Sequence, residues 1–200
     1  MFRHKSNPSG TWSSPTKVAT GSQFLDYWIP SVLTLSNGII NVYFTKNGPE
    51  SNFAITNSAK KTGRIMVSIS NNYGFSFSAP QEITTTCDAE YARATQNSFG
   101  SILLVFSRYA LNSSNTDCAD EFIDGFPVSN IHQIWSSDSG ATWSGESILY
   151  RSPYGSAMHP YISVETTRKQ TPCANCQWTL VFQQRTQQGK WAVMNMSSQN

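Results

Sequence analysis

The side chains best suited to chemistry lie in one short segment, residues 88–93, which reads Asp-Ala-Glu-Tyr-Ala-Arg. Hydrolysis of a glycosidic bond commonly needs a carboxylate acid or base and a nucleophile. An arginine fork binds a carboxylate through two parallel hydrogen bonds. We therefore predict catalytic roles for Asp88, Glu90 and Tyr91 and a substrate-binding role for Arg93. The alternative is that these groups are solvated or paired with one another.

Two further segments occupy corresponding places in the chain, at 26–30 and 156–161. They supply the other predicted substrate-binding residues, which are Asp26, Trp28, His159 and Tyr161. Asp26 corresponds to Asp88 when the glycines of the turns that follow are aligned. Alternatively, both aspartates cap the start of the strand that follows them. His159 could likewise be a polar residue at the rim of the substrate face, without a role in binding.

A repeated pattern of short strands is predicted to position these segments. Residues 28–35 and 39–45 flank an Asn-Gly turn and are rich in β-branched and aromatic residues, which is typical of a β-hairpin. Residues 91–107 repeat this hairpin, and a third copy begins at residue 159. Each hairpin continues into further strands, so each unit is expected to have four. The three reactive segments should therefore gather where the first strands of the units begin.

The turn of the second hairpin in each unit follows the pattern Ser-x-Asp-x-Gly-x-Thr-Trp. Residues 136–143 match it fully, 70–77 match it with Asn, Ser and Phe, and 10–15 keep a shortened tail. An Asp or Asn side chain can accept backbone N–H groups further along such a turn, and glycine adopts a positive φ at little cost. The aromatic ends of the copies recur at steps of 65 and 66 residues, which indicates a repeat architecture. The predicted structural residues are Ser136, Asp138, Gly140, Thr142, Trp143, Ser70, Asn72, Gly74 and Phe77.

The pattern at 136–143 resembles the Asp-box, or bacterial neuraminidase repeat, of sialidases and related six-bladed propellers. As a strand pattern the resemblance covers nearly the whole chain. It implies an all-β partial β-propeller with about three four-stranded antiparallel blades. The blades are expected at about 24–84, 88–150 and 156–200, the last one incomplete, and 10–20 is expected to be the outer strand of a preceding or closing blade. In this family the boxes lie opposite the substrate face, so the resemblance gives them a structural role.

The same resemblance implies a glycoside hydrolase that acts on terminal sugars of glycans, with tyrosine as nucleophile in sialidases. The chain departs from that family in two respects. Phe2-Arg3 continues into His4-Lys5 instead of the family's Phe-Arg-Ile-Pro, and only Arg93 lies at the start of an inner strand, where sialidases gather three arginines. The alternative is a non-catalytic extracellular module that binds glycans through aromatic residues or builds an assembly. Its expected aromatic groove contains Tyr27, Trp28, Tyr91 and Tyr161.

Composition narrows the classes of partner. Only 13% of the residues are charged and the net charge is +2, with no block of Lys or Arg, so nucleic acid is not expected as a partner. No apolar stretch approaches the roughly 20 residues of a membrane span, and the first residues lack the apolar core of a signal peptide. We expect a glycan partner, and either further blades or self-association to complete the ring.

Four cysteines, Cys87, Cys118, Cys173 and Cys176, indicate disulfides if the protein is secreted. Placed on the expected blades, Cys87 and Cys118 fall in loops on one face, and the Cys-x-x-Cys pair would bond to itself. A zinc site lacks a second Cys-x-x-Cys or a His pair, and free thiols are the remaining alternative. The glycosylation sequons at Asn112 and Asn195 also favour a secreted, extracellular protein.

A long insertion at 109–130 contains four further carboxylates, which are Asp117, Asp120, Glu121 and Asp124. Their spacing does not fit an EF-hand loop. We predict a solvated loop and no metal or cofactor, with calcium binding as the alternative.

Overall fold

The computed structural model of the protein describes residues 1, 3, 11–20, 26–47, 63–84, 89–109, 122–123, 126–164 and 178–197. In this part of the chain every regular element is a β-strand, so the prediction of an all-β fold is confirmed. The strands form three antiparallel sheets and one short hairpin, and within each sheet they follow the order of the chain.

Sheet 1 contains β1 (Asp26–Thr34), β2 (Ile40–Asn47), β3 (Arg64–Ser70) and β4 (Gln81–Glu82). Sheet 2 contains β5 (Ala89–Gln96), β6 (Ile102–Tyr109), β9 (Ser129–Ser136) and β10 (Ser147–Tyr150). Sheet 3 contains β11 (Ala157–Val164), β12 (Trp178–Arg185) and β13 (Trp191–Ser197). The hairpin pairs β7 (Phe122–Ile123) with β8 (Phe126–Pro127).

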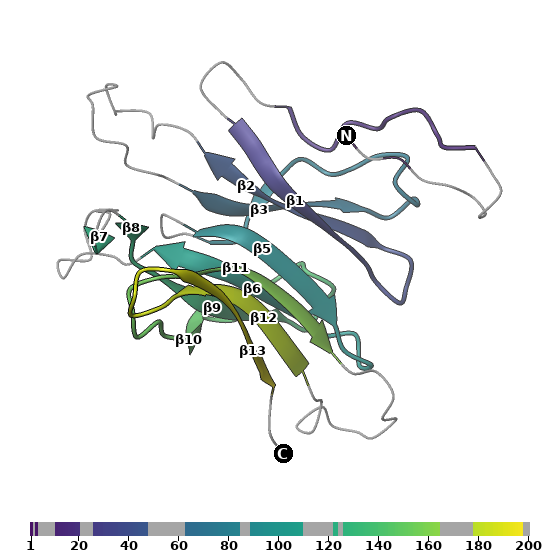
Figure 1. Ribbon diagram of the computed structural model, residues 1–200. Coiled ribbons are helices and arrows are strands. Elements are labelled where there is room, and N and C mark those ends of the chain that lie inside the picture. The colour runs from purple at the N-terminus through teal and green to yellow at the C-terminus, as the bar shows by residue number, and fades with distance from the viewer. Residues whose placement is uncertain are drawn as a thin grey trace.

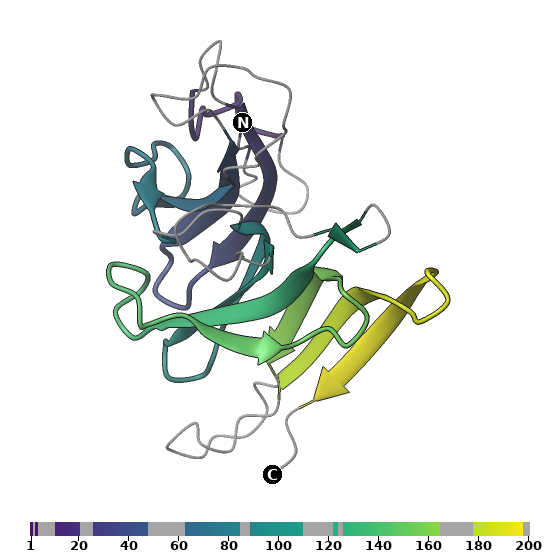
Figure 2. The same cartoon turned by 90° about the vertical axis from the view of Figure 1, so that its left-hand side faces the viewer.

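The three sheets succeed one another across the molecule, from sheet 1 (purple to blue) to sheet 3 (green to yellow), as Figure 2 shows. Their first strands lie side by side, with β5 between β1 and β11 (Figure 1). Hydrogen bonds join neighbouring sheets at this level. The Ser31 hydroxyl donates to the Ala92 carbonyl at 2.8 Å, and the His159 N–H donates to the Ser107 hydroxyl at 3.1 Å.

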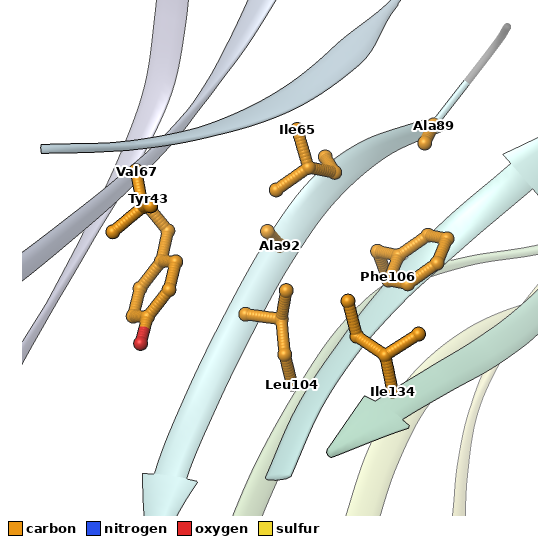
Figure 3. Close-up of a cluster of buried hydrophobic side chains, with 8 residues drawn as sticks. All are labelled: Tyr43, Ile65, Val67, Ala89, Ala92, Leu104, Phe106 and Ile134. Carbon is orange, nitrogen blue, oxygen red and sulfur yellow. The ribbon is translucent and has the colours of Figure 1, made fainter. Parts of the chain in front are cut away.

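Strand β6 is buried along its whole length because both of its faces pack against other sheets. Side chains of a strand alternate between the two faces. Leu104 and Phe106 therefore enter the core shared with sheet 1, drawn in Figure 3, while Leu103 and Val105 enter the core shared with sheet 3. This two-sided burial explains why the sequence of β6 is a continuous apolar run and does not alternate with polar residues.

The other face of sheet 1 packs against the N-terminal segment. Its cluster contains Ile40, Val42, Phe44 and Met66, with Val18, Ala19 and Phe77 against it. An outer strand was expected over 10–20; within 11–20 the structure has a single bridge residue, Thr16, and no strand.

The two turns that repeat the Ser-x-Asp/Asn-x-Gly pattern have the same hydrogen bonds. After β9, the Ser136 hydroxyl accepts the Gly140 N–H at 2.8 Å and donates to Asp138 Oδ1 at 2.8 Å. Asp138 Oδ1 also accepts the Thr142 N–H at 2.8 Å. The corresponding bonds after β3 join Ser70, Asn72, Gly74 and Ser76. Each turn is thus closed by the side chains that define the pattern.

The turn after β9 also fastens sheet 2 to sheet 1. The buried Asn41 of β2 donates through Nδ2 to the Ser139 carbonyl at 3.1 Å. Trp143 packs edge-on against Tyr43, with ring centroids 6.1 Å apart. A Cβ at Gly140, where φ is +95°, would lie 2.8 Å from Asn41 Nδ2. The position therefore requires glycine both for its backbone angle and for the close approach of the neighbouring sheet.

Gly140→Ala should lower the free energy of unfolding by about 1–3 kcal/mol, because alanine would take a strained φ and displace Asn41. Gly145→Ala is the matched control, since a Cβ there meets nothing within 4 Å. The control should change the free energy of unfolding by less than about 0.5 kcal/mol. Urea unfolding measures both variants. Equal losses would contradict the packing argument.

Asp138→Asn should flatten the acid dependence of stability. The Thr142 hydroxyl donates to Asp138 Oδ2 at 2.5 Å; this bond, with those from the Thr142 N–H and Ser136, lowers the pKa of the Asp138 carboxyl to about 2. Such a carboxylate stabilises the fold above its unfolded pKa of about 4, and this contribution is lost as pH falls through the folded value. Thermal unfolding of both proteins between about pH 4 and 2 tests this window. If the stabilities of the two proteins fell in parallel as pH decreased, the result would contradict this prediction. Asn72 fills the same position after β3, so the variant should fold at neutral pH.

Candidate functional site

Each of the three neighbouring first strands has a bulge near its start. The pairing register shifts between Trp28 and Ser31 in β1, between Glu90 and Arg93 in β5, and between Met158 and Tyr161 in β11. One residue inside each bulge has a positive φ, which is 54° for Ile29, 61° for Tyr91 and 54° for His159.

A left-handed backbone at a residue other than glycine costs of the order of 1–3 kcal/mol, and a β-branched residue is especially unfavourable there. Because this conformation is costly, its recurrence at equivalent positions of three strands indicates that the surrounding fold maintains it. Bulges re-aim side chains and are frequent beside functional sites. We call the end of the sheets that holds residues 29, 91 and 159 the bulge edge.

The bulge edge lies at the opposite end of the sheets from the two patterned turns. In sheet 2, Glu90 pairs with Ser107, whereas Gln96, Ile102 and Ser136 are aligned at the other end, where the turn at 136–143 begins. We call this second end the box edge. In the described residues, the bulges and the two patterned turns therefore lie at opposite ends of the sheets.

Tyr91 and His159 meet at the bulge edge. Their rings are 4.0 Å apart between centroids and nearly perpendicular, at 76°. His159 Nδ1 lies 3.0 Å from Gln183 Oε1. An amide oxygen only accepts, so in the tautomer that donates from Nδ1 to Gln183 the lone pair of the imidazole is on Nε2. The arrangement brings a phenol and an imidazole, two groups able to transfer protons, into ring contact.

Glu90 lies behind this pair and is fully buried. The hydroxyl of Tyr109, which is also buried, donates to Glu90 Oε2 at 3.1 Å. The charge of this buried carboxylate acts on its neighbours. Burial raises the pKa of the Tyr91 phenol, the charge of Glu90 raises it further, and a hydrogen bond with Tyr109 partly offsets both. At neutral pH Tyr91 is therefore a proton donor and not a phenolate.

Three arginines in the described segments have partners within the protein. Arg93 Nη1 donates to the Ala92 carbonyl at 2.9 Å. Arg64 pairs with Glu82 at 2.9 Å. Arg108 is buried and bonds Glu146 through two of its nitrogens.

Sequence reasoning missed a cluster of three charged or titratable residues on sheet 2. His132 Nδ1 lies 2.5 Å from the Glu146 carboxylate, which Arg108 also binds. Burial alone would raise the pKa of Glu146, but the hydrogen bonds from His132 and Arg108, and their charges, hold it below its usual value. The three residues come from separate strands or loops, so no spacing in the sequence signals the contact. The cluster neutralises a buried arginine, which is a structural task.

The remaining predicted residues are scattered or fall outside the described segments. Asp26 and Trp28 belong to β1, opposite Asn47 and Thr45. Tyr161 is exposed on β11, on the face opposite Ile162, which packs toward sheet 2. The other predicted positions outside the described residues are Asp88, Cys87, Cys118, Cys173, Cys176, Asn112, Asp117, Asp120, Glu121 and Asp124.

Asn195 is exposed on β13. Within the described ranges, no group of three or more His, Cys, Asp or Glu could hold a metal ion. The described residues also include no helix long and apolar enough to cross a membrane.

Solved structures resemble the chain in fold at low sequence identity. A protein of unknown function from Dyadobacter fermentans DSM 18053 is 18% identical with a TM-score of 0.61, and the match covers 90% of this chain and 53% of that one. A Hadza microbial sialidase is 13% identical with a TM-score of 0.56, covering 87% and 35%. An ulvan lyase, a polysaccharide lyase, is 14% identical with a TM-score of 0.50, covering 94% and 43%.

The chain thus spans about half the length of the first of these structures and less of the other two. No family model matches the chain, and no curated protein matches it. At these identities the likeness concerns the fold alone, which is shared with proteins described as a sialidase and as a polysaccharide lyase.

Ultraviolet difference titration should detect the late ionisation of Tyr91. A phenol whose pKa is raised stabilises the folded state below its unfolded value of 10, and this contribution is lost as pH rises through the folded value. Subtracting the Tyr91→Phe titration from that of the unsubstituted protein should leave a transition above pH 10. Glu90→Gln should move this transition to lower pH. A transition at or below pH 10 would contradict the assignment.

Proposed function

We propose that this chain is an arc of a sialidase-like β-propeller that hydrolyses terminal sugars of glycans at its bulge edge. The observation that supports it best is the set of three adjacent bulges, which brings Tyr91 and His159 into contact. The likeness in fold to a sialidase and to a polysaccharide lyase favours a glycan as the substrate. The two patterned turns, with their shared hydrogen bonds at the opposite edge, favour the Asp-box interpretation.

In this proposal Tyr91 and His159 divide the proton transfers. The Tyr91 hydroxyl protonates the leaving glycosidic oxygen as the bond to the sugar breaks. His159 Nε2 accepts a proton from the attacking water, whose oxygen bonds to the anomeric carbon. Glu90 is a positioning residue, because its charge keeps Tyr91 protonated and its carboxylate holds Tyr109. The reaction as written needs no metal or cofactor.

A second candidate is a non-catalytic module that binds glycans at the same edge. The burial of Glu90 favours it, because this carboxylate, the one next to Tyr91 in the described residues, is closed off from solvent. Both candidates place the protein outside the cell. In both, further sheets or other copies complete the ring.

The two candidates separate in one experiment on the full-length protein. Fluorogenic sialosides and arabinosides report turnover, and calorimetric titration with the corresponding methyl glycosides reports binding. If the bulge edge is catalytic, Tyr91→Phe and His159→Ala should each lower kcat by about 100-fold or more. Tyr154→Phe, an exposed tyrosine outside the ring pair, is the control and should keep full turnover.

Saturable binding without turnover, lost in Tyr91→Phe, would support the binding module. Neither binding nor turnover across the panel would overturn both candidates. If turnover persisted in both Tyr91→Phe and His159→Ala, the reaction would take place at another site.

A further inference from the structure

The box edge exposes several aromatic side chains that the proposed reaction does not use. Tyr73 and Phe75 lie in the turn after β3, Phe99 lies in the turn between β5 and β6, and Trp135 precedes the turn after β9. Soluble proteins rarely expose contiguous apolar surface without a binding role. The question is whether these side chains form one surface and what would bind to it.

Hydrogen bonds and close contacts join the turns of sheets 1 and 2 at this edge. The Ser36 N–H donates to Gln96 Oε1 at 2.8 Å, and Asn37 Nδ2 donates to the Ser139 hydroxyl at 3.4 Å. A Cβ at Gly38 would lie 3.6 Å from the Tyr73 ring. The turn of sheet 1 between β1 and β2 therefore contacts the turns of both sheets, and the aromatic residues share one edge.

A hollow of about 350 Å³ at this edge is lined in part by Trp135 and Trp143. Hydroxyl-bearing side chains complete its lining, and these are Ser101, Ser136, Ser137, Thr142 and Ser144. The lining contains no charged side chain. Small-molecule sites commonly combine apolar or aromatic walls with a few fixed polar groups, and the volume falls within their usual range.

The walls of the hollow are held in place by bonds already made within the turn. The Ser144 hydroxyl accepts the Trp135 N–H at 2.8 Å, and the Ser144 N–H donates to the Trp135 carbonyl at 2.7 Å. The Thr142 hydroxyl is bound to Asp138. The backbone that presents Trp135 is thus fixed, so little conformational entropy is lost when a ligand covers the ring.

We propose that this hollow binds one neutral pyranose unit of a polysaccharide, stacked on Trp135. A pyranose ring has an apolar face that suits an indole and hydroxyl groups that suit a serine-rich wall. The nearest charge of the turn is the Asp138 carboxylate, which disfavours an anionic sugar. The site lies at the opposite end of the sheets from Tyr91 and His159, so it is independent of the proposed reaction and would hold a polymer while the bulge edge acts on its end.

The test is calorimetric titration of the full chain with methyl glycosides of glucose, galactose and N-acetylglucosamine, and with the methyl glycoside of N-acetylneuraminic acid as the anionic probe. At least one neutral probe should bind saturably and more tightly than the anionic one. Trp135→Ala should weaken this binding by about tenfold or more, whereas Trp135→Phe should restore part of it.

Trp191→Ala is the matched control. Trp191 is 40% exposed on β13 and Trp135 is 38% exposed on β9, but Trp191 pairs with Arg185 near the bulge end of sheet 3. The control should bind the neutral probe with unchanged affinity. The thermal midpoint of each variant shows whether it is folded. If Trp135→Ala is unfolded, the binding of the conservative Trp135→Phe variant decides the test.

Three results would overturn the inference. The first is no saturable binding of a neutral probe, or binding of the anionic probe alone. The second is binding that is lost in Tyr91→Phe but kept in Trp135→Ala, which would place the sugar at the bulge edge only and leave the proposed function intact. The third is self-association in sedimentation velocity that Trp135→Ala abolishes, which would make the hollow an interface between copies of the chain.

Discussion

The packing of sheet 2 between two neighbours is the constraint on which the rest of the structure depends. Its strand β6 has no solvent-facing side, because Leu104 and Phe106 enter one core while Leu103 and Val105 enter the other. Burying such a side chain contributes roughly 1.5–3 kcal/mol. The two cores fix the distance and the angle between the three sheets, and therefore the positions of everything at their two edges.

Each edge uses this constraint in a different way. At the box edge, polar turns close the hairpins and Asn41 ties one sheet to the next, so the geometry is set by local hydrogen bonds. At the bulge edge, three strands accept a left-handed residue that they would avoid in isolation. The strain is tolerated because the packed sheets hold each strand on both sides of the bulge. Stability is concentrated at one end and reactive side chains at the other.

Local signals allowed much of the fold to be predicted from the sequence. The hairpins expected at 28–45 and 91–107 correspond to β1–β2 and β5–β6 with small shifts in their bounds. The bulges could not be predicted, because Ile29, Tyr91 and His159 include no glycine or asparagine to mark a positive φ. The contact of Arg108 with Glu146 and His132 was missed for a related reason, since it depends on which strands pair and in which register.

The sequence led us to expect both a further sheet that completes the ring and a glycan on Asn195. On β13 these two expectations exclude each other. Successive side chains of a strand alternate between faces, so Val193 and Asn195 share one face while Met194 and Met196 share the other. Met196 packs toward sheet 2, and the face with Val193 points away from it. Tyr161 and Val181 lie in line with Asn195 on that outer face. A further sheet that completes a ring would cover this surface, whereas a glycan on Asn195 needs it open to solvent. Tyr161 and Val193 are both exposed on this face, which favours a covering sheet, and under that arrangement the sequon at Asn195 is unused.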